Sequence, residues 1–126
     1  MASRVLIIGD DLNLQTFLTE KIRQYGCEVE CASDTNEAMN YLFQNNYSLI
    51  VMDMQTRNLA GYSLGSSIRK FEHFKAKLAV PIIAICESPD ESRCLTSGIN
   101  LCIAKPLSDE KLSESVSKLL PHIAQI

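Results

Sequence analysis

Residues 49–53 read Leu-Ile-Val-Met-Asp, four consecutive apolar residues followed at once by a carboxylate. An apolar run without alternation is typical of a strand in a parallel sheet that helices cover on both faces. A charged side chain directly after such a run is costly to bury unless it is paired. The stretch therefore predicts a buried strand that ends at a functional residue, Asp53.

Similar short runs lie on both sides of this strand, and segments with helical periodicity separate them. They are residues 5–8, 27–32, 81–85 and 101–104. The run at 27–32 alternates at Glu28 and Glu30, which predicts an edge strand. Strands that alternate with helices build βαβ units around a parallel sheet. The pattern predicts an α/β fold with helices on both faces of the sheet. We expect a flavodoxin-like (βα)5 three-layer sandwich with five parallel strands in the order 2-1-3-4-5.

The predicted helices carry recognisable starting signals. Asp34, with Glu37 three residues later, is a capping pair that opens the second helix. Ser88 and Pro89 match the N-cap and first helical positions of the fourth helix. The third helix, around residues 64–71, is weakened by glycine and serine residues.

Composition limits the class of protein. A chain of 126 residues, 46% hydrophobic and 21% charged, without a linker or repeat, is expected to form a single domain over residues 1–126. The net charge of −3 argues against nucleic-acid binding. The sequence has no membrane-length apolar run and no leader pattern, so we expect a cytoplasmic protein without membrane insertion. The five cysteines are odd in number and include no Cys-x-x-Cys pair, which favours buried thiols over a zinc site or a disulfide framework.

The residues that follow the strands matter most, because the crevice of an open α/β sheet lies beyond the carboxyl ends of its strands. Asp10 and Asp53 would come from neighbouring strands there, and two close carboxylates usually need a cation such as Mg²⁺. Lys105 would pair with Asp53 or bind an anion, and its bond to Pro106 is a candidate cis peptide. The alternative is that Asp10 and Asp11 merely cap the first helix.

These features resemble the response-regulator receiver domains of two-component signalling, and the match runs from about residue 4 to residue 120. The segments that carry it are residues 4–11, 36–39, 47–55, 81–85 and 98–106, together with Gly61. The sequence around Asp53 and Lys105 is most similar to that of receivers attached to hybrid sensor kinases. The resemblance implies a signalling module rather than an enzyme.

By this resemblance, Asp53 would accept a phosphoryl group from a histidine kinase or a phosphotransfer domain, and the chain would signal through contacts with a downstream protein. Asp10, Asp53 and the backbone carbonyl of Gln55 would hold Mg²⁺. Asp11 is an additional candidate ligand. Lys105 would pair with a phosphoryl oxygen.

Several positions depart from the family pattern. Gly9 replaces the first of two acids after strand one, and Cys86 replaces the Ser or Thr after strand four. Cys102 stands where the family has an aromatic switch residue on strand five. Thr56 and Arg57 replace the usual Met-Pro pair and bring a cation beside the site. A thiol is a weaker hydrogen-bond donor than a hydroxyl, so the response to a phosphoryl group is expected to be weaker.

The segment from residue 86 to residue 98 is short by about one helical turn. Receivers often dimerise through the fourth and fifth helices. Because the fourth helix is shortened here, we expect a monomer. Together with the replaced switch residues, the short segment leaves open a pseudo-receiver that binds partners without phosphorylation. A flavin or NAD enzyme on the same fold is disfavoured, because residues 9–11 are anionic and contain no G-x-G-x-x-G motif.

Overall fold

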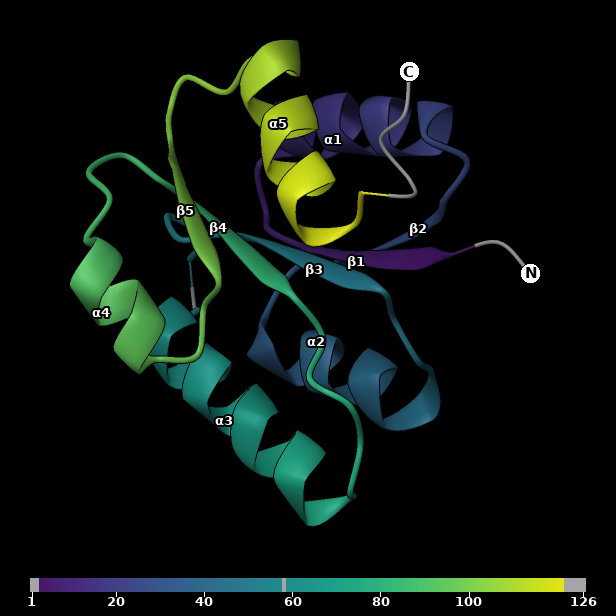
Figure 1. Ribbon diagram of the computed structural model, residues 1–126, viewed down its shortest axis with the longest axis vertical. Coiled ribbons are helices and arrows are strands. Elements are labelled where there is room, and N and C mark those ends of the chain that lie inside the picture. Colours follow the sequence, from purple (N-terminus) through teal and green to yellow (C-terminus); the bar gives the residue numbers. More distant parts are fainter. Residues whose placement is uncertain (1–2, 58, 122–126) are drawn as a thin grey trace.

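A computed structural model of the chain describes residues 3–57 and 59–121. Its five strands form one parallel sheet in the order β2-β1-β3-β4-β5, which confirms the predicted topology (Figure 1). The strands are β1 (Arg4–Ile8), β2 (Glu28–Ala32), β3 (Leu49–Asp53), β4 (Ile82–Cys86) and β5 (Leu101–Ala104). The run that alternates with glutamates is an edge strand, as predicted, and β5 forms the other edge.

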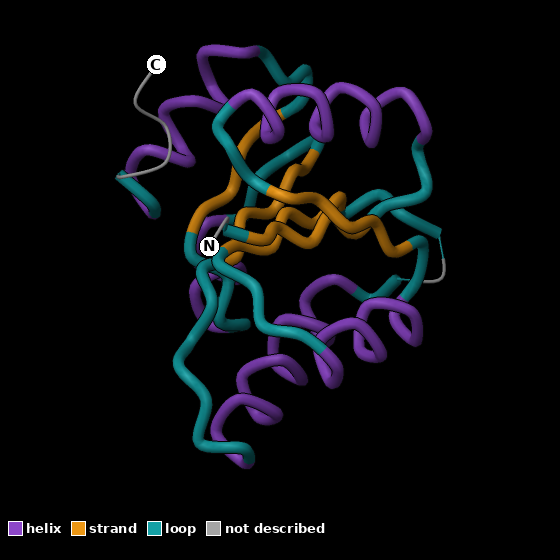
Figure 2. The backbone as a smooth tube through the Cα atoms, turned by 90° about the vertical axis from the view of Figure 1, so that its right-hand side faces the viewer, coloured by secondary structure: helices purple, strands orange, loops and turns teal. Residues whose placement is uncertain are grey.

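Helices cover both faces of the sheet, so the fold is the three-layer α/β sandwich expected from the sequence (Figures 1 and 2). The helices in the described residues are α1 (Leu12–Gln24), α2 (Thr35–Gln44), α3 (Gly61–Phe74), α4 (Glu91–Thr96) and α5 (Asp109–Leu119). The buried residues of α1 and α5 pack on one face, and those of α2, α3 and α4 pack on the other. None of the helices described combines the length and the apolar character needed to cross a membrane.

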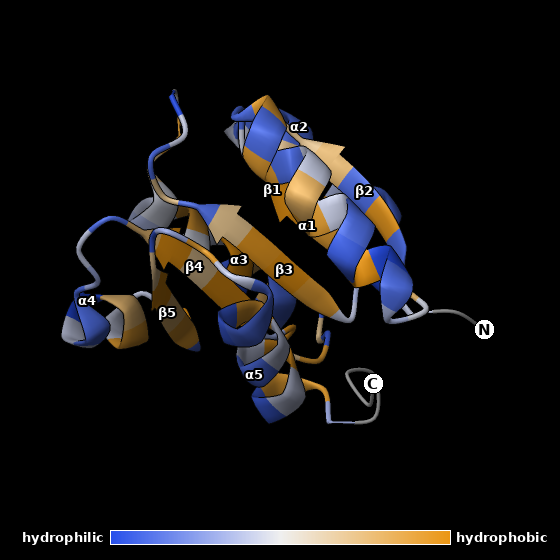
Figure 3. Cartoon of the chain, turned by 90° about the horizontal axis from the view of Figure 1, so that it is seen from above, coloured by the Kyte–Doolittle hydropathy of each residue, from blue (hydrophilic) through white to orange (hydrophobic). Residues whose placement is uncertain are grey.

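The central strand β3 shows why its apolar run is continuous. Leu49 and Val51 join the core beneath α1 and α5, whereas Ile50 and Met52 join the core on the opposite face. All five residues of β3 are buried, and Figure 3 shows β3 and β4 as the hydrophobic centre of the molecule. Full burial of one aliphatic side chain contributes about 1.5–3 kcal/mol, so a polar residue on either face would be costly.

The helix starts follow the capping rules, with one correction. Asp34 accepts a hydrogen bond from the Glu37 backbone N–H at 2.8 Å and opens α2 as predicted. The fourth helix begins at Glu91, so the prediction that Ser88 is its N-cap is wrong. Asp90 is the N-cap, because its carboxylate accepts the Arg93 backbone N–H at 3.0 Å. The resulting α4 has only six residues.

Strand register brings the sequence-distant ends of the strands to one edge. Ile8 of β1 pairs with Met52 of β3, and Asp53 pairs with Ile85 of β4. Cys86 of β4 in turn pairs with Ala104 of β5. Because all these strands are parallel, Gly9, Asp53, Cys86 and Lys105 are placed along the same carboxyl edge.

Candidate functional site

Asp53 is the last residue of β3, and its side chain is only 4% exposed. One carboxylate oxygen, Oδ1, lies 3.1 Å from Lys105 Nζ and accepts the backbone N–H of Gln55 at 3.0 Å. The structure therefore brings Lys105 to Asp53, as the sequence suggested, and the paired charge explains how a carboxylate can follow a buried strand.

Lys105 directly follows β5, and a backbone hydrogen bond to β4 fixes its position. Its N–H donates to the carbonyl of Cys86 at 2.8 Å, which extends the β4–β5 ladder by one residue beyond the strand. The Lys105–Pro106 bond is cis, as expected from the sequence. The lysine side chain is 27% exposed, so solvent and a ligand can reach it while it contacts the buried Asp53.

Asp10 and Asp11 have different roles in the structure. Asp11 is the N-cap of α1, and its carboxylate accepts the backbone N–H groups of Asn13 and Leu14 at 3.0 and 3.3 Å. Asp10 does not cap this helix. Its Oδ2 accepts the backbone N–H of Arg57 at 3.2 Å and lies 3.8 Å from Arg57 Nε. The alternative that both aspartates cap the first helix is therefore confirmed for Asp11 and wrong for Asp10. Asp10 instead contacts the loop that follows Asp53.

Gly9 fills a place where β1 and β3 end close together. A Cβ atom on Gly9 would lie 3.3 Å from Asp53 Cβ and 3.5 Å from Thr56 Oγ1, closer than most Cβ contacts in the first case. Thr56 is buried and donates its hydroxyl to the Asp53 carbonyl at 2.7 Å, which supports the chain just below the carboxylate. The Gln15 side-chain amide donates to the Gly9 carbonyl from α1. These roles of Thr56 and Gln15 were missed, because nothing in their spacing indicates them.

Cys86 lies at the end of β4 and is 3% exposed. Burial raises the pKa of its thiol above the ordinary value, the negative charge of Asp53 raises it further, and Lys105 partly offsets the rise. The thiol therefore stays protonated at neutral pH and can act only as a weak donor. It lines a small cavity of about 280 Å³ that Arg93 of α4 also lines, with the guanidinium stacked 4.0 Å from the ring centroid of Tyr62.

The cysteines depart from the expectation of separate buried thiols. The structure places the sulfur atoms of Cys94 in α4 and Cys102 in β5 in contact, with Cα atoms 6.9 Å apart. Cys27, Cys31 and Cys86 remain single thiols. The sequence does not reveal the pair, because the turn that returns the chain from α4 to β5 determines which residues face each other.

The acidic edge fits a hard divalent cation. In the described part of the chain, no three His, Cys, Asp or Glu side chains gather into a metal-binding group. A cation held by the carboxylates of Asp10 and Asp53 would also need backbone and water oxygens. That donor set suits Mg²⁺, which usually takes only one or two protein carboxylates. The residues present thus fit the ion.

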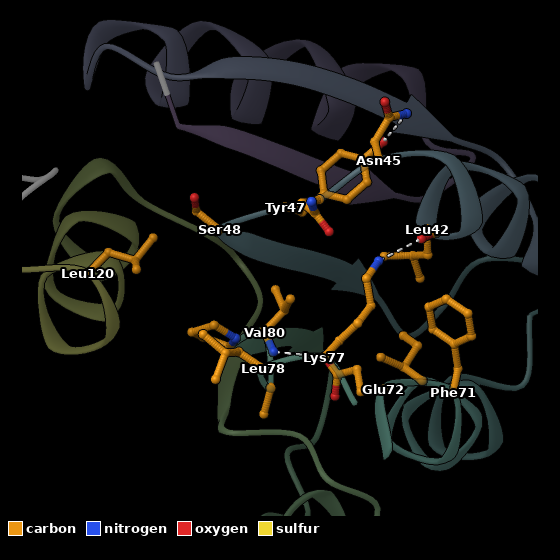
Figure 4. Close-up of a pocket in the computed structure, with 14 residues that line it drawn as sticks. Leu42, Asn45, Tyr47, Ser48, Phe71, Glu72, Lys77, Leu78, Val80 and Leu120 are labelled. Atoms are coloured by element: carbon orange, nitrogen blue, oxygen red, sulfur yellow. Dashed lines mark hydrogen bonds between the residues drawn. The ribbon is translucent and has the colours of Figure 1, made fainter. Parts of the chain in front are cut away.

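An apolar cavity of about 500 Å³ lies at the opposite end of the sheet and is separate from this site (Figure 4). Its two charged side chains, Glu72 and Lys77, have partners within the chain. Glu72 accepts the Val80 backbone N–H at 2.7 Å, and Lys77 donates to the Leu42 carbonyl at 3.5 Å (Figure 4).

Several proteins similar in sequence are sensor kinases much longer than this chain. It is 32% identical to the hybrid signal transduction histidine kinase K of Dictyostelium discoideum, over 94% of this chain and 10% of the kinase. It is 31% identical to the CAI-1 autoinducer sensor kinase/phosphatase CqsS of Vibrio cholerae, over 90% of this chain and 17% of that protein. The chain thus spans less than a fifth of either protein.

Solved structures show the same fold. The co-crystal structure of the Saccharomyces cerevisiae phosphotransfer protein Ypd1 with the receiver domain of Ssk1 contains a chain with a TM-score of 0.86 and 27% identity, covering 99% of this chain and 93% of that one. The receiver domain of the Pseudomonas aeruginosa sensor kinase PA1611 has magnesium coordinated in its active-site cleft. It has a TM-score of 0.81 and 27% identity, covering 96% of this chain and 99% of that one. The sequence profile described as "Response regulator receiver domain" matches residues 5–117. With its sheet order and its acidic strand edge, the chain belongs to the response-regulator receiver family.

Proposed function

We propose that Asp53 is the phosphoacceptor of this receiver domain. The observation that carries the proposal is the buried Asp53 carboxylate at the end of β3, paired with Lys105 at 3.1 Å. In the proposed step, a carboxylate oxygen forms a bond to phosphorus while the bond from phosphorus to a histidine nitrogen of the donor breaks. The imidazole leaves, and Asp53 carries the phosphoryl group as a mixed anhydride.

Asp10, Asp53 and the backbone carbonyl of Gln55 would hold Mg²⁺ at this edge. When bound, the ion offsets negative charge on the phosphoryl group. Asp11 is not part of this proposed set, because its carboxylate caps α1. Asp10 is available after exchange of its Arg57 side-chain contact, since the arginine side chain is 91% exposed.

Lys105 and Cys86 would respond to the modification. Lys105 already lies against Asp53 Oδ1 and can turn to a phosphoryl oxygen while staying next to the acceptor. The Cys86 thiol, in place of a hydroxyl, would donate a weaker hydrogen bond to the same group. The charge of Lys105 would therefore contribute more to holding the phosphoryl group than Cys86 does.

The partners follow from this role. We propose a histidine kinase or a phosphotransfer protein as donor, supported by the contact between a receiver and Ypd1 in the yeast complex. The signal would leave through binding of a downstream protein by a monomeric, cytoplasmic domain that is not itself an enzyme. Nucleic acid is not a proposed partner, given the net charge of −3.

A second candidate is a pseudo-receiver that binds its partner without phosphorylation. The observation in its favour is that Gly9 and Cys86 replace polar groups at the site, while Cys102 replaces the aromatic switch residue. The structure contains the Asp53–Lys105 pair nonetheless, so phosphorylation is the first candidate.

The two candidate functions predict different results in a phosphorylation experiment. Incubation with acetyl phosphate and Mg²⁺, followed by intact-mass analysis, should add one phosphoryl group to the wild-type chain and to Asp11→Asn. The Asp53→Asn variant should gain nothing. Absence of a mass gain in wild type, with both acetyl phosphate and a cognate phosphotransfer protein, would rule out the phosphoacceptor role and favour the pseudo-receiver.

A further inference from the structure

Cys94 and Cys102 connect the short helix α4 to the edge strand β5. Cys94 is 1% exposed and is the only buried residue of the six-residue helix α4. Cys102 is half-buried on the edge strand β5, and the two sulfur atoms are in contact. The Cα atoms are 6.9 Å apart, at the upper end of the range that a disulfide bridge spans.

The surroundings of α4 make this contact important for its position. Its start is held by the Asp90 cap, and its end turns through Gly98 into β5. On the surface of α4, the Arg93 guanidinium stacks on the ring of Tyr62 in α3. A covalent link at Cys94 would therefore fix the middle of a short helix whose other anchors lie at its ends and on its surface.

We propose that Cys94 and Cys102 form a reversible disulfide that tethers α4 to β5 in response to oxidation. The oxidant class is a low-molecular-weight disulfide such as oxidised glutathione. The Cys102 thiolate attacks one oxidant sulfur and releases one glutathione thiol, which leaves a mixed disulfide on Cys102. Cys94 then displaces the second glutathione thiol. The protein loses two thiol protons and two electrons, and the oxidant becomes two thiols.

The order of these steps follows from exposure. Cys102 is half-buried and can be reached by a small disulfide, whereas Cys94 is enclosed and has Cys102 as its neighbour. Cys27 and Cys86 are buried single thiols with raised pKa values, which disfavours the thiolate at neutral pH. Cys31 is half-buried but stands alone on β2, so it can form a mixed disulfide and nothing further.

This bridge would give the domain a second input that does not depend on Asp53. In Figure 1, α4 and β5 lie on the same side of the molecule, so a tether between them changes the surface that both elements present. The inference does not rest on the phosphoacceptor proposal, and it is tested without phosphodonor or Mg²⁺. Failure of one proposal therefore leaves the other intact.

The test treats the purified chain with oxidised glutathione, blocks remaining thiols with iodoacetamide in denaturant, and maps the tryptic peptides by mass. No Lys or Arg lies between Cys94 and Cys102, so one peptide carries both residues. In wild type this peptide should lose both alkylation sites and weigh two hydrogens less than the reduced peptide. Dithiothreitol should restore both sites. The matched control Cys31→Ser should behave like wild type.

The variant Cys102→Ser should retain one alkylated or glutathionylated cysteine in that peptide and form no bridge. Hydrogen exchange supplies the second readout, because the tether should slow exchange of the α4 amides, residues 91–96, by about tenfold on oxidation. The same treatment should leave these amides unchanged in Cys102→Ser. The proposal is overturned if oxidised wild type keeps two alkylatable cysteines in the peptide, or if bridging leaves α4 exchange unaltered.

Discussion

Asp53 and Asp10 are held in different ways, although both are acids at strand ends. Asp53 is buried and paired with Lys105, so its charge is offset inside the protein. Asp10 is one-third exposed and contacts the exposed Arg57 in the next loop. Burial accounts for the difference, because an exposed pair is weak and exchanges readily with water or an ion. Asp10 is thus suited to change partner when a cation binds.

Arg57 is therefore expected to compete with Mg²⁺ for Asp10. Replacing Arg57 with alanine removes the guanidinium, while the backbone N–H contact to Asp10 remains. Mg²⁺ should bind about twofold more tightly, because an exposed ion pair contributes well under 1 kcal/mol. Isothermal titration with MgCl₂ measures the change. Arg23→Ala, on the exposed side of α1, is the matched control, and equal affinities for both variants would contradict competition.

Among the elements, α3 is joined to its neighbours by Arg69. Its guanidinium donates to the carbonyls of Val80 and Gly98 and to the side chain of Asn100, at 2.7–3.0 Å. It also pairs at 2.8 Å with Glu72, which is 5% exposed. One side chain thus links α3 to the loop before β4 and to the turn after α4.

The Arg69→Met variant is expected to lose about 3 kcal/mol of unfolding free energy, because it leaves the Glu72 carboxylate buried without its cation. Urea unfolding followed by circular dichroism measures this loss. The neighbouring Lys70→Met substitution, at an exposed position of the same helix, should change stability by less than about 0.5 kcal/mol. Similar effects of the two variants would mean that the Arg69 network does not stabilise the fold.

At the scale of the whole molecule, burial raises the pKa of three buried side chains among the described residues, one tyrosine hydroxyl and two cysteine thiols. Burial raises the pKa of Tyr47, and its hydrogen bond to Glu30 at 2.6 Å raises it further. Burial also raises the thiol pKa values of Cys27 and Cys86. In the unfolded chain these groups ionise near their ordinary values of 9.0 for cysteine and 10.0 for tyrosine. Their contribution to the unfolding free energy is fully present below those values. It is lost as pH rises towards the folded-state pKa.

The unfolding free energy is therefore expected to fall once pH exceeds about 9. The Tyr47→Phe variant should cost about 1–2 kcal/mol at pH 7, because it removes a hydrogen bond to a carboxylate. Above pH 10 the difference from wild type should shrink, since only wild type can ionise this side chain on unfolding. Urea unfolding at a series of pH values measures both effects. A difference that stays constant from pH 7 to pH 11 would contradict the assignment.

The strands could be predicted because their causes are local. A parallel strand covered on both faces needs consecutive apolar residues, and residues 49–52 meet that condition before any fold is known. A carboxylate after such a run needs a partner, so Asp53 and Lys105 also followed from the sequence. The start of α4 did not, because Ser88 and Asp90 are both good caps and only the path of the loop decides between them.

The sequence by itself thus predicted the strands of the sheet and the carboxylate of Asp53 at the end of the central strand. Tertiary structure alone decided which neighbour each acid meets, so that Asp11 caps α1 while Asp10 turns to Arg57. It also brought Cys94 against Cys102 across the turn after α4. The physical reason is the distance along the chain over which each effect acts. Hydrophobic periodicity can be recognised within a few consecutive residues, whereas these contacts depend on how the loops bring separate segments together.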